Sequence, residues 1–230
     1  MPFEGPSGVA RWAAQRGHAL DAHAVYSGAP LPSPEATEAL LVLGGPMGVH
    51  DERQLPWLTA EKRYIEAALK RTIPVLGICL GAQLLADVMG ASVRRAARAE
   101  IGWFPVTFTA EALAHPLFEG FPPELNVMHW HGDTFEQPAG MRPVGHSEAC
   151  ANQGFFDAHG RLMGLQFHME WDADTAARLI EACPEDLHQG GPFVQTPQDI
   201  LDRPACYAAA QDYMHCLLDR LYGPVPGALA

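Results

Sequence analysis

Residues 73–90 read IPVLGICLGAQLLADVMG, and this stretch decides which fold the sequence predicts. The apolar run over 73–78 is typical of a short buried strand. Apolar residues then recur at helical spacing from Leu80 to Val88, and Gly90 is a natural helix end. The stretch therefore predicts a strand that passes directly into a helix.

Cys79 lies at this joint, between Gly77 and Gly81. A residue in such a tight turn has its side chain lifted out of the sheet, and the flanking glycines permit strained backbone and the close approach of a substrate. The N-terminus of the helix also stabilises a thiolate, the reactive form of cysteine. Although most free cysteines pack as small hydrophobic residues, this position favours a nucleophile. The ordinary packing role is expected for Cys150, Cys183, Cys206 and Cys216.

The composition limits the class of protein and its partners. With 230 residues the chain can bury a full core, and we expect a single domain over 1–230. Its formal net charge of -12 and the lack of a Lys/Arg cluster disfavour nucleic acid and anionic membranes as partners. Five scattered cysteines without a C-x-x-C pair favour a reducing compartment, so we expect a cytoplasmic protein without disulfides. We find no signal-peptide pattern and no apolar run that could span a membrane.

Strands and helices alternate in the first half of the predicted chain. We expect a helix over 10–15, a strand over 20–26, a loop over 31–38, a strand buried on both faces over 39–43 and a helix over 57–71. This alternation predicts an α/β fold with a mostly parallel central sheet flanked by helices, of the flavodoxin-like kind.

The second half of the chain is richer in predicted strands, which suggests a smaller antiparallel β portion. Strands are expected over 92–95, 102–108, 125–131 and 164–168, helices over 175–183 and 205–221, and a surface loop over 184–204. A doubly wound fold normally opens with a strand, whereas this chain opens with Pro and Gly followed by a helical pattern. We therefore expect the first strand to be missing, at a cost in unpaired backbone on its neighbour.

A base for the cysteine is found in the segment GLQFHME at 164–170. His168 and Glu170 are two residues apart, so on extended backbone they point to the same side. A cysteine nucleophile needs a base near its sulfur, and the base needs a group that fixes its tautomer. Cys79, His168 and Glu170 would supply these three roles.

The turn Gly44-Gly45-Pro46 follows a predicted buried strand, at the end of the sheet where α/β proteins place their sites. Glycines let backbone N–H groups face a substrate. The N–H groups of Gly45 and Leu80 would then form an oxyanion hole, although a Gly-Gly-Pro turn is a weak signal when taken alone.

Three motifs in this order, Gly44-Gly45-Pro46, GICLGAQ at 77–83 and FHME at 167–170, resemble those of the class I glutamine amidotransferase family. The resemblance runs over most of the chain and is greatest to stand-alone domains similar to the amidotransferase half of GMP synthetase. The stretches EIGW at 100–103 and HWHGD at 129–133 add to it.

This resemblance implies a mechanism. The Cys79 thiolate would attack the side-chain amide of glutamine, and Gly45 and Leu80 would hold the oxyanion. His168, oriented by Glu170, would give a proton to the departing ammonia and then activate water to clear the γ-glutamyl thioester. No cofactor and no metal are implied. The substrate pocket would be lined by Gly44, Pro46, Gln83, Trp130, His131, Gly132 and Asp133.

Two residues depart from the family pattern. Met169 stands where proline usually separates the catalytic His and Glu, so the placement of Glu170 is expected to be looser. Trp130 stands where glutamine-specific members often carry a small polar residue, so it is expected to narrow or reshape the pocket. His129 and His131 are two apart on a strand, a spacing as often found in a packed pair as in a set of metal ligands.

Three functions remain open from the sequence. The first is a glutamine amidotransferase whose ammonia passes to a separate synthetase chain, because the chain has no phosphate-binding P-loop. The second is a γ-glutamyl peptidase or hydrolase that cleaves a γ-glutamyl amide with a larger leaving group. The third, disfavoured by the complete Cys-His-Glu set, is a regulatory homologue without turnover. The oligomeric state stays open, a homo-oligomer included.

Overall fold

A five-stranded sheet forms the centre of the computed structural model, which describes residues 4–188 and 190–223. The strand order is β1-β2-β8-β7-β5. The first three strands are parallel, whereas β7 and β5 run antiparallel to their neighbours. The predicted α/β fold is confirmed, with a sheet that is mixed. The strands are β1 (Leu40–Val42), β2 (Val75–Ile78), β5 (Arg142–Pro143), β7 (Gly154–Phe156) and β8 (Leu162–Leu165).

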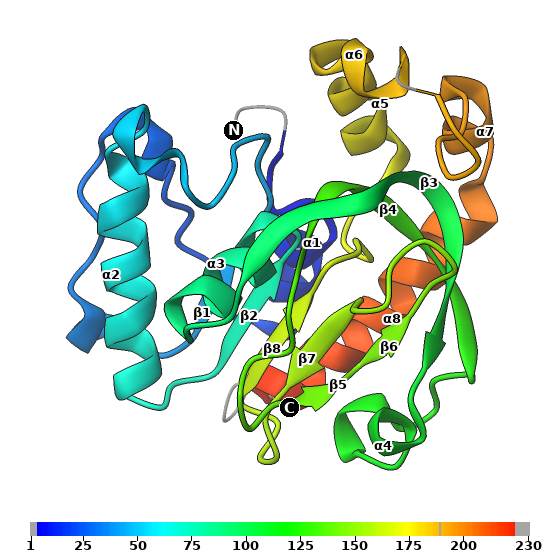
Figure 1. Cartoon of the computed structure of the whole chain (residues 1–230). Coiled ribbons are helices and arrows are strands. Elements are labelled where there is room, and N and C mark those ends of the chain that lie inside the picture. Colours follow the sequence, from blue (N-terminus) through cyan, green and yellow to red (C-terminus); the bar gives the residue numbers. More distant parts are fainter. Residues whose placement is uncertain (1–3, 189, 224–230) are drawn as a thin grey trace.

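A second, antiparallel sheet has the order β4-β3-β6, as the predicted smaller β portion required. It consists of β3 (Val93–Phe108), β4 (Glu124–Phe135) and β6 (Gly145–His146). The two strands predicted at 92–95 and 102–108 are one strand of 16 residues, because pairing with β4 continues on both sides of an irregularity between Arg95 and Glu100. In Figure 1, β3 arches across the upper part of the molecule, below α5 and α6, and β4 lies beside it.

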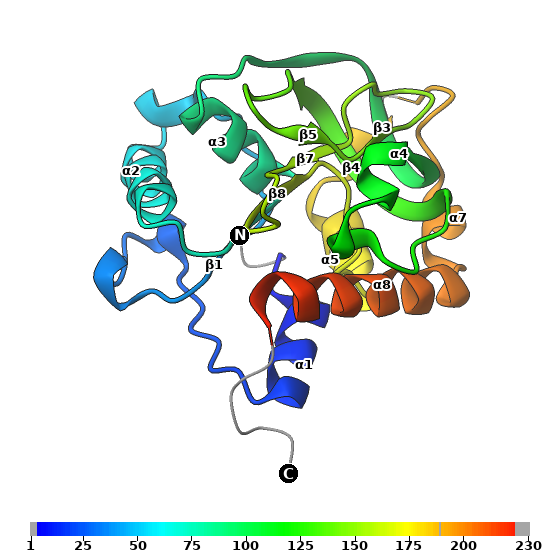
Figure 2. The ribbon, with the colours of Figure 1, turned by 90° about the horizontal axis from the view of Figure 1, so that it is seen from below.

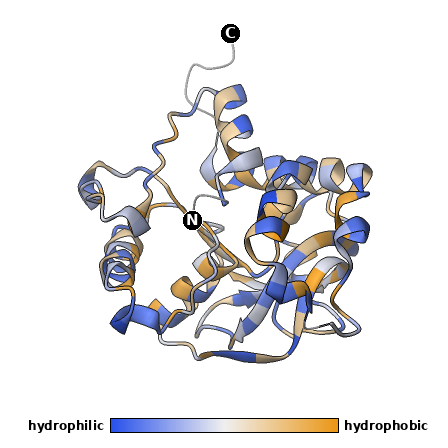
Figure 3. Cartoon of the chain, turned by 90° about the horizontal axis from the view of Figure 1, so that it is seen from above, coloured by the Kyte–Doolittle hydropathy of each residue, from blue (hydrophilic) through white to orange (hydrophobic). Residues whose placement is uncertain are grey.

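Helices cover both faces of the central sheet (Figures 1 and 2). One apolar cluster packs α2 and α3 against one face, and a larger one joins α1, α5 and α8 to the other face and to β3 and β4. Figure 3 shows that the long helices carry both hydrophobic and hydrophilic residues around their axes, as helices on a sheet should. The helices are α1 (Ser7–Arg16), α2 (Trp57–Lys70), α3 (Leu80–Val88), α4 (Ala110–Leu113), α5 (Ala173–Ala182), α6 (Pro184–His188), α7 (Pro197–Leu201) and α8 (Pro204–Tyr222).

Several short segments differ from expectation. The strand predicted at 20–26 is wrong: this segment pairs with no strand and holds only a 3-10 turn, η1 (Val25–Ser27), and Leu20 is 43% exposed. Its apolar composition alone was a poor guide because a strand also needs a sheet edge to pair with. Another 3-10 turn, η2 (Pro34–Ala36), lies in the predicted loop at 31–38. Two further turns of this kind are η3 (Asp51–Arg53) and η4 (Pro116–Phe118).

The predicted surface loop at 184–204 is partly helical, since it contains α6 and α7. Proline occupies a first-turn position of α7, where its fixed φ suits a helix, and the Thr196 side chain caps the helix N-terminus. The strand predicted over 164–168 ends at Leu165, and His168 forms only an isolated bridge to Met128.

Within the described residues no strand precedes β1. β1 consequently pairs only with β2 and is an edge strand. Of its residues only Val42 is fully buried, so the expected burial on both faces is only partly met. No described helix is both long enough and apolar enough to cross a membrane.

Candidate active site

Cys79 occupies the elbow between β2 and α3, as predicted. Its backbone has φ 53 and ψ -110, a conformation that costs a non-glycine residue about 1–3 kcal/mol and is typical of functional turns. The Cys79 N–H donates to the Leu165 carbonyl of β8 at 2.8 Å, which anchors the elbow to the sheet. The side chain is thereby held at the carboxyl end of the parallel strands.

The glycines around Cys79 are also required by packing. A β-carbon on Gly77 would lie 2.5 Å from the Gly81 carbonyl oxygen, and one on Gly81 would lie 2.0 Å from that of Val42. The first turn of α3 therefore lies directly against the backbone of β1 and β2. This close approach places the start of the helix, and its unbonded N–H groups, beside the cysteine.

His168 is positioned by Glu170, with 2.7 Å between Nδ1 and the carboxylate Oε1. Both residues are almost fully buried. The second carboxylate oxygen accepts from the Met169 N–H at 3.0 Å, a hydrogen bond that proline could not donate. The Met169 N–H thus gives Glu170 a contact that the usual proline would lack.

The other ring nitrogen of His168, Nε2, is buried and has no hydrogen-bond partner among the described residues. The Cys79 side chain lies beside this ring: a β-carbon placed on Gly44 would be 3.4 Å from His168 Cε1 and 3.6 Å from Cys79 Cβ. Trp171 stacks on the imidazole with 4.0 Å between ring centroids and limits its rotation. Cys79, His168 and Glu170 are therefore brought together as the sequence predicted.

The electrostatics of His168 favour its charged form. Burial by itself lowers the pKa of this imidazole, but the charge of Glu170 and the neighbouring Cys79 outweigh burial and raise the pKa to about 10. A protonated imidazole next to a sulfur stabilises a thiolate.

Two glutamines near the cysteine form a chain of contacts. Gln166 Nε2 donates to Cys79 Sγ at 3.8 Å, and Gln83 Nε2 donates to Gln166 Oε1 at 3.2 Å. The side chain of Gln83, a predicted substrate residue, thus already donates one hydrogen bond within the protein. Gln166 was missed in the sequence, although its place two residues before His168 on the same segment was a usable signal.

The Gly44-Gly45-Pro46 turn lies next to the cysteine, as expected. A β-carbon on Gly45 would be 3.1 Å from Leu80 Cδ2, so the two predicted oxyanion donors belong to neighbouring segments. Because Leu80 is the first residue of α3, its N–H has no acceptor within the helix.

A cavity of about 200 Å³ opens at Cys79. Gly45 and most of the predicted substrate residues line it, whereas Gly44, Leu80, His168 and Glu170 lie outside the lining. The sequence did not point to several of its other residues. The lining comprises Glu4, Gly45, Pro46, Met47, Gly48, Cys79, Gln83, Arg95, Ala99, Ile101, Trp130, His131, Gly132, Asp133, Leu179, Cys183 and Asp186.

Trp130 forms one wall of this cavity together with α6. Its indole Nε1 donates to Asp186 Oδ2 at 2.9 Å, and its ring packs near Trp171. The backbone carbonyl of Trp130 accepts from the Cys79 thiol at 3.6 Å. Trp130 thus lines the pocket together with a residue of α6, a helix that the sequence did not predict.

Glu4 was not predicted as a site residue. A β-carbon on Gly44 would lie 3.1 Å from its Oε1, and its Oε2 is buried without a hydrogen-bond partner in the described chain. Burial raises the pKa of this carboxyl above its usual value, against the opposing effect of His168. No motif could have indicated it, since it lies far from the other site residues in sequence.

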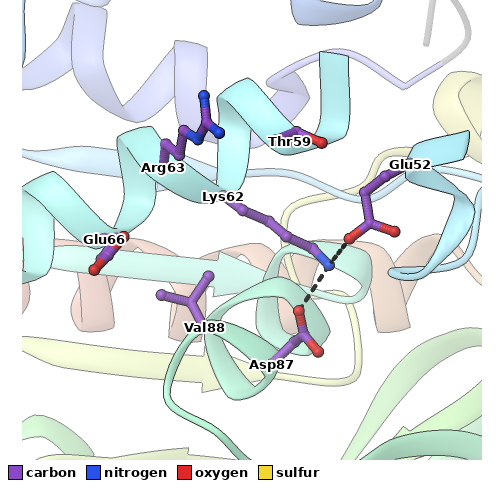
Figure 4. A pocket seen from close by; sticks show the side chains of 7 residues that line it. All are labelled: Glu52, Thr59, Lys62, Arg63, Glu66, Asp87 and Val88. Atoms are coloured by element: carbon purple, nitrogen blue, oxygen red, sulfur yellow. Dashed lines mark hydrogen bonds and ion pairs between the residues drawn. The ribbon is translucent and has the colours of Figure 1, made fainter. Parts of the chain in front are cut away.

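A separate hollow of about 350 Å³ lies between α2 and α3 and shares no residue with the Cys79 cavity (Figure 4). Lys62 pairs there with Glu52 and, at 2.7 Å, with Asp87. These ion pairs link η3, α2 and the end of α3, so we interpret the hollow as structural.

One other group of titratable residues is buried near the cavity. Glu100, His129 and His131 each offer one ligand atom, and these atoms lie within 4.8 Å of one another. In the sequence, Glu100 belongs to the EIGW stretch that resembles the family, and nothing there indicated that it would meet the two histidines.

Fold and site together define an α/β protein with a cysteine at a strand–helix elbow, beside a buried His–Glu pair. The sequence model described as "Glutamine amidotransferase class-I" matches residues 9–182. The chain is 34% identical over 202 residues to the glutamine amidotransferase-like protein YfeJ of Salmonella typhimurium, covering 84% of this chain and 83% of that protein. It is 30% identical over 173 residues to one subunit of the glutamine-hydrolyzing GMP synthase of Saccharolobus solfataricus, covering 71% of this chain and 88% of that protein.

Solved structures agree with these sequence matches. A glutamine amidotransferase from Thermotoga maritima superimposes with a TM-score of 0.87 at 35% identity, over 96% of this chain and 94% of that one. A glutamine amido transferase from Methylobacillus flagellatus superimposes with a TM-score of 0.89 at 29% identity, over 98% and 92%. The chain belongs to the class I glutamine amidotransferase family.

Proposed function

We propose that this protein hydrolyses the side-chain amide of glutamine through a γ-glutamyl thioester on Cys79. The observation that carries the proposal is the buried His168 ring, which is fixed by Glu170 on one nitrogen and lies beside the cysteine with the other nitrogen unpaired among the described residues. Such an imidazole can take the thiol proton and later give it up.

The steps assign one role to each residue. The Cys79 thiolate adds to the amide carbon, and the N–H groups of Gly45 and Leu80 stabilise the oxyanion. His168 protonates the leaving nitrogen, so ammonia departs and the thioester forms. His168 then takes a proton from water, which attacks the thioester and releases glutamate and the thiolate.

We propose that Gly44, Pro46, Gln83, Trp130, His131, Gly132 and Asp133 hold the substrate. The cavity lining has charges of both signs, with Arg95 and Asp133 3.2 Å apart at its rim. The α-carboxylate and α-ammonium of glutamine require groups of opposite charge, and these residues are suited to that task.

The ammonia is proposed to pass to a separate synthetase chain in the cytoplasm. The relative from Saccharolobus solfataricus is named as one subunit of a GMP synthase, and this supports a division of labour between two chains. The five cysteines are free in the structure, which fits a reducing compartment.

A γ-glutamyl amide with a larger leaving group is the second candidate substrate. It is favoured by the Trp130–Asp186 contact, because this contact adds a wall to the cavity between Trp130 and α6. A leaving group lying against this wall would bury more apolar surface than ammonia does.

The test is labelling with an electrophilic glutamine analogue, read by peptide mass spectrometry with and without excess glutamine. Labelling of Cys79 that glutamine blocks is the expected result. Cys183 lines the same cavity and is the internal control: Cys183→Ser should label normally, whereas Cys79→Ser should not. Protection by γ-glutamyl dipeptides and not by glutamine would favour the second candidate, and labelling of Cys183 alone would contradict both.

Variants then test the individual roles by measuring ammonia release. Cys79→Ala should abolish turnover, since the nucleophile is lost. Glu170→Gln should retain a small fraction of it, because His168 keeps its place beside the thiol but loses its orienting charge. Full turnover by Cys79→Ala would reject the mechanism.

A further inference from the structure

Three buried side chains meet between β3 and β4, and one of them, His131, also lines the Cys79 cavity. The antiparallel register pairs Glu100 with His131 and Gly102 with His129, so residues far apart in sequence face one another. Glu100 and His129 are 0% exposed and His131 is 5% exposed. A carboxylate and two imidazoles are therefore enclosed together.

The outward nitrogens of the two histidines have defined partners. His129 Nε2 lies 3.3 Å from the Phe104 carbonyl oxygen, and His131 Nδ1 lies 3.0 Å from that of Asp133. A carbonyl oxygen only accepts hydrogen bonds, so each of these nitrogens carries the hydrogen. In the neutral imidazole the opposite nitrogen then has a bare lone pair.

Both lone pairs point at the same carboxylate oxygen. Glu100 Oε2 lies 3.5 Å from His129 Nδ1 and 3.3 Å from His131 Nε2. It already accepts hydrogen bonds from Ser147 Oγ at 3.0 Å and Gln153 Nε2 at 2.7 Å. Both histidine nitrogens and the other carboxylate oxygen are buried without a hydrogen-bond partner among the described residues. Acceptors that face one another in this way are destabilising unless a cation or a shared proton lies between them.

We propose that Glu100, His129 and His131 bind one divalent transition-metal ion, with Zn²⁺ as the preferred ion. Two imidazole nitrogens and one carboxylate oxygen are a known zinc donor set. For zinc bonds of about 2.0–2.1 Å, the edges of a tetrahedron of ligand atoms are about 3.3–3.4 Å. The separations of 3.3 and 3.5 Å between Glu100 Oε2 and the two nitrogens are close to that value, and the two nitrogens lie within 4.8 Å of one another.

The surroundings of the group are also those of a metal site. Ligating histidines typically donate their other N–H to a carbonyl or carboxylate, and ligating carboxylates are themselves hydrogen-bonded. The carbonyls of Phe104 and Asp133 and the side chains of Ser147 and Gln153 occupy these positions.

The ion would act on the site through the strand. His129 and His131 flank Trp130, whose carbonyl accepts from the Cys79 thiol. Cross-linking β3 to β4 at this point would fix the position of that carbonyl. The proposed role is therefore structural, and it does not depend on the proposed glutamine hydrolysis.

The test is binding of Zn²⁺ to the full chain after dialysis against a chelator. The Cys79→Ser background is used, because a thiolate beside His168 could itself bind zinc. We expect one Zn²⁺ per chain in competition with a chromophoric chelator, a rise in the melting temperature, and, with Co²⁺, visible absorption bands typical of a tetrahedral site. Absence of stoichiometric binding by this protein would reject the proposal.

Variants locate the ion. Glu100→Gln and His129→Gln should each weaken Zn²⁺ binding by at least about 100-fold, the upper range for loss of an outer-shell partner. His146→Gln, an exposed histidine on β6, is the matched control and should leave the affinity unchanged. Unchanged affinity in Glu100→Gln would place the ion elsewhere and overturn the proposal. If the buried variants fail to fold, the Co²⁺ spectrum of the Cys79→Ser protein alone tests the proposal, and a spectrum without tetrahedral bands would reject it.

Discussion

Cys79 shows how a single strained residue is held in place by its surroundings. Its positive φ is one of three at non-glycine residues in the described chain, and it lies between the strand and the helix that the sequence predicts. Strain of this kind persists only where the surrounding structure holds it, here through Gly77, Gly81 and the Leu165 carbonyl. The strained conformation of Cys79 is therefore maintained by contacts from β2, α3 and β8.

The strain can be measured by two substitutions at Cys79. Glycine adopts a positive φ without penalty, so Cys79→Gly should be more stable than Cys79→Ala by about 1 kcal/mol, although it loses more side-chain contacts. Urea denaturation of both variants gives the comparison. A less stable glycine variant would mean that the elbow is not strained.

The pKa of His168 makes a prediction about pH. Because the pKa is raised from 6.5 to about 10 in the folded state, the charged imidazole stabilises the fold fully below pH 6.5, and this contribution is lost as the pH rises to about 10. Glu170→Gln removes the charge that raises the pKa of His168, so the stability of this variant should fall less as the pH rises. Between pH 6 and pH 10, the free energy of unfolding should fall by a few kcal/mol more in the wild-type protein than in Glu170→Gln, on the order given by linkage. Parallel curves would contradict the assigned charge state.

At the scale of elements, the site depends on how closely α3 approaches the sheet. The turn of α3 that carries Gly81 touches the backbone of β1, and Lys62 links the other end of α3 to α2 and η3. Both ends of this helix are thus fixed. The N–H groups at its start can face a substrate without reorganisation.

Gly81→Ala tests this approach. The new β-carbon would lie 2.0 Å from the Val42 carbonyl oxygen, so α3 must shift outward. We expect a loss of about 1–3 kcal/mol in the free energy of unfolding, in spite of the better helix propensity of alanine. Gly5→Ala is the control, since a β-carbon there meets nothing within 4 Å. Equal stability of the two variants would mean that the contact is relaxed in solution.

At the scale of the whole molecule, the first and last helices meet behind the site. The Gly8 N–H of α1 donates to the Glu170 carbonyl at 2.9 Å, and Gln211 Nε2 of α8 donates to the Trp171 carbonyl at 2.8 Å. Figure 2 shows α1 packed beside α8. The segment with the His–Glu pair is thus supported from both ends of the described chain, and we propose that 1–230 folds as a single domain.

Asp219→Ala tests this joint. Asp219 accepts from the buried Trp12 indole at 2.7 Å and from Arg16, so its removal leaves an unpaired N–H and should cost about 1–3 kcal/mol. Asp212→Ala, exposed on the same helix, should be nearly neutral. Tryptophan fluorescence and far-ultraviolet circular dichroism should report one coincident transition in all three proteins. Two separate transitions would contradict the single domain.

The sequence by itself determined the α/β class, the elbow at Cys79 and the segments with His168 and Glu170. These features are local, since periodicity, glycines and motif spacing can be read within a dozen residues. It misplaced a strand at 20–26 and missed α6 and α7, because pairing with a sheet edge and packing against a wall are not local properties. Tertiary structure alone decided that Glu4 lies near the cysteine and that Glu100 faces two histidines. The physical reason is that strand register and helix docking are set by burial summed over the whole molecule.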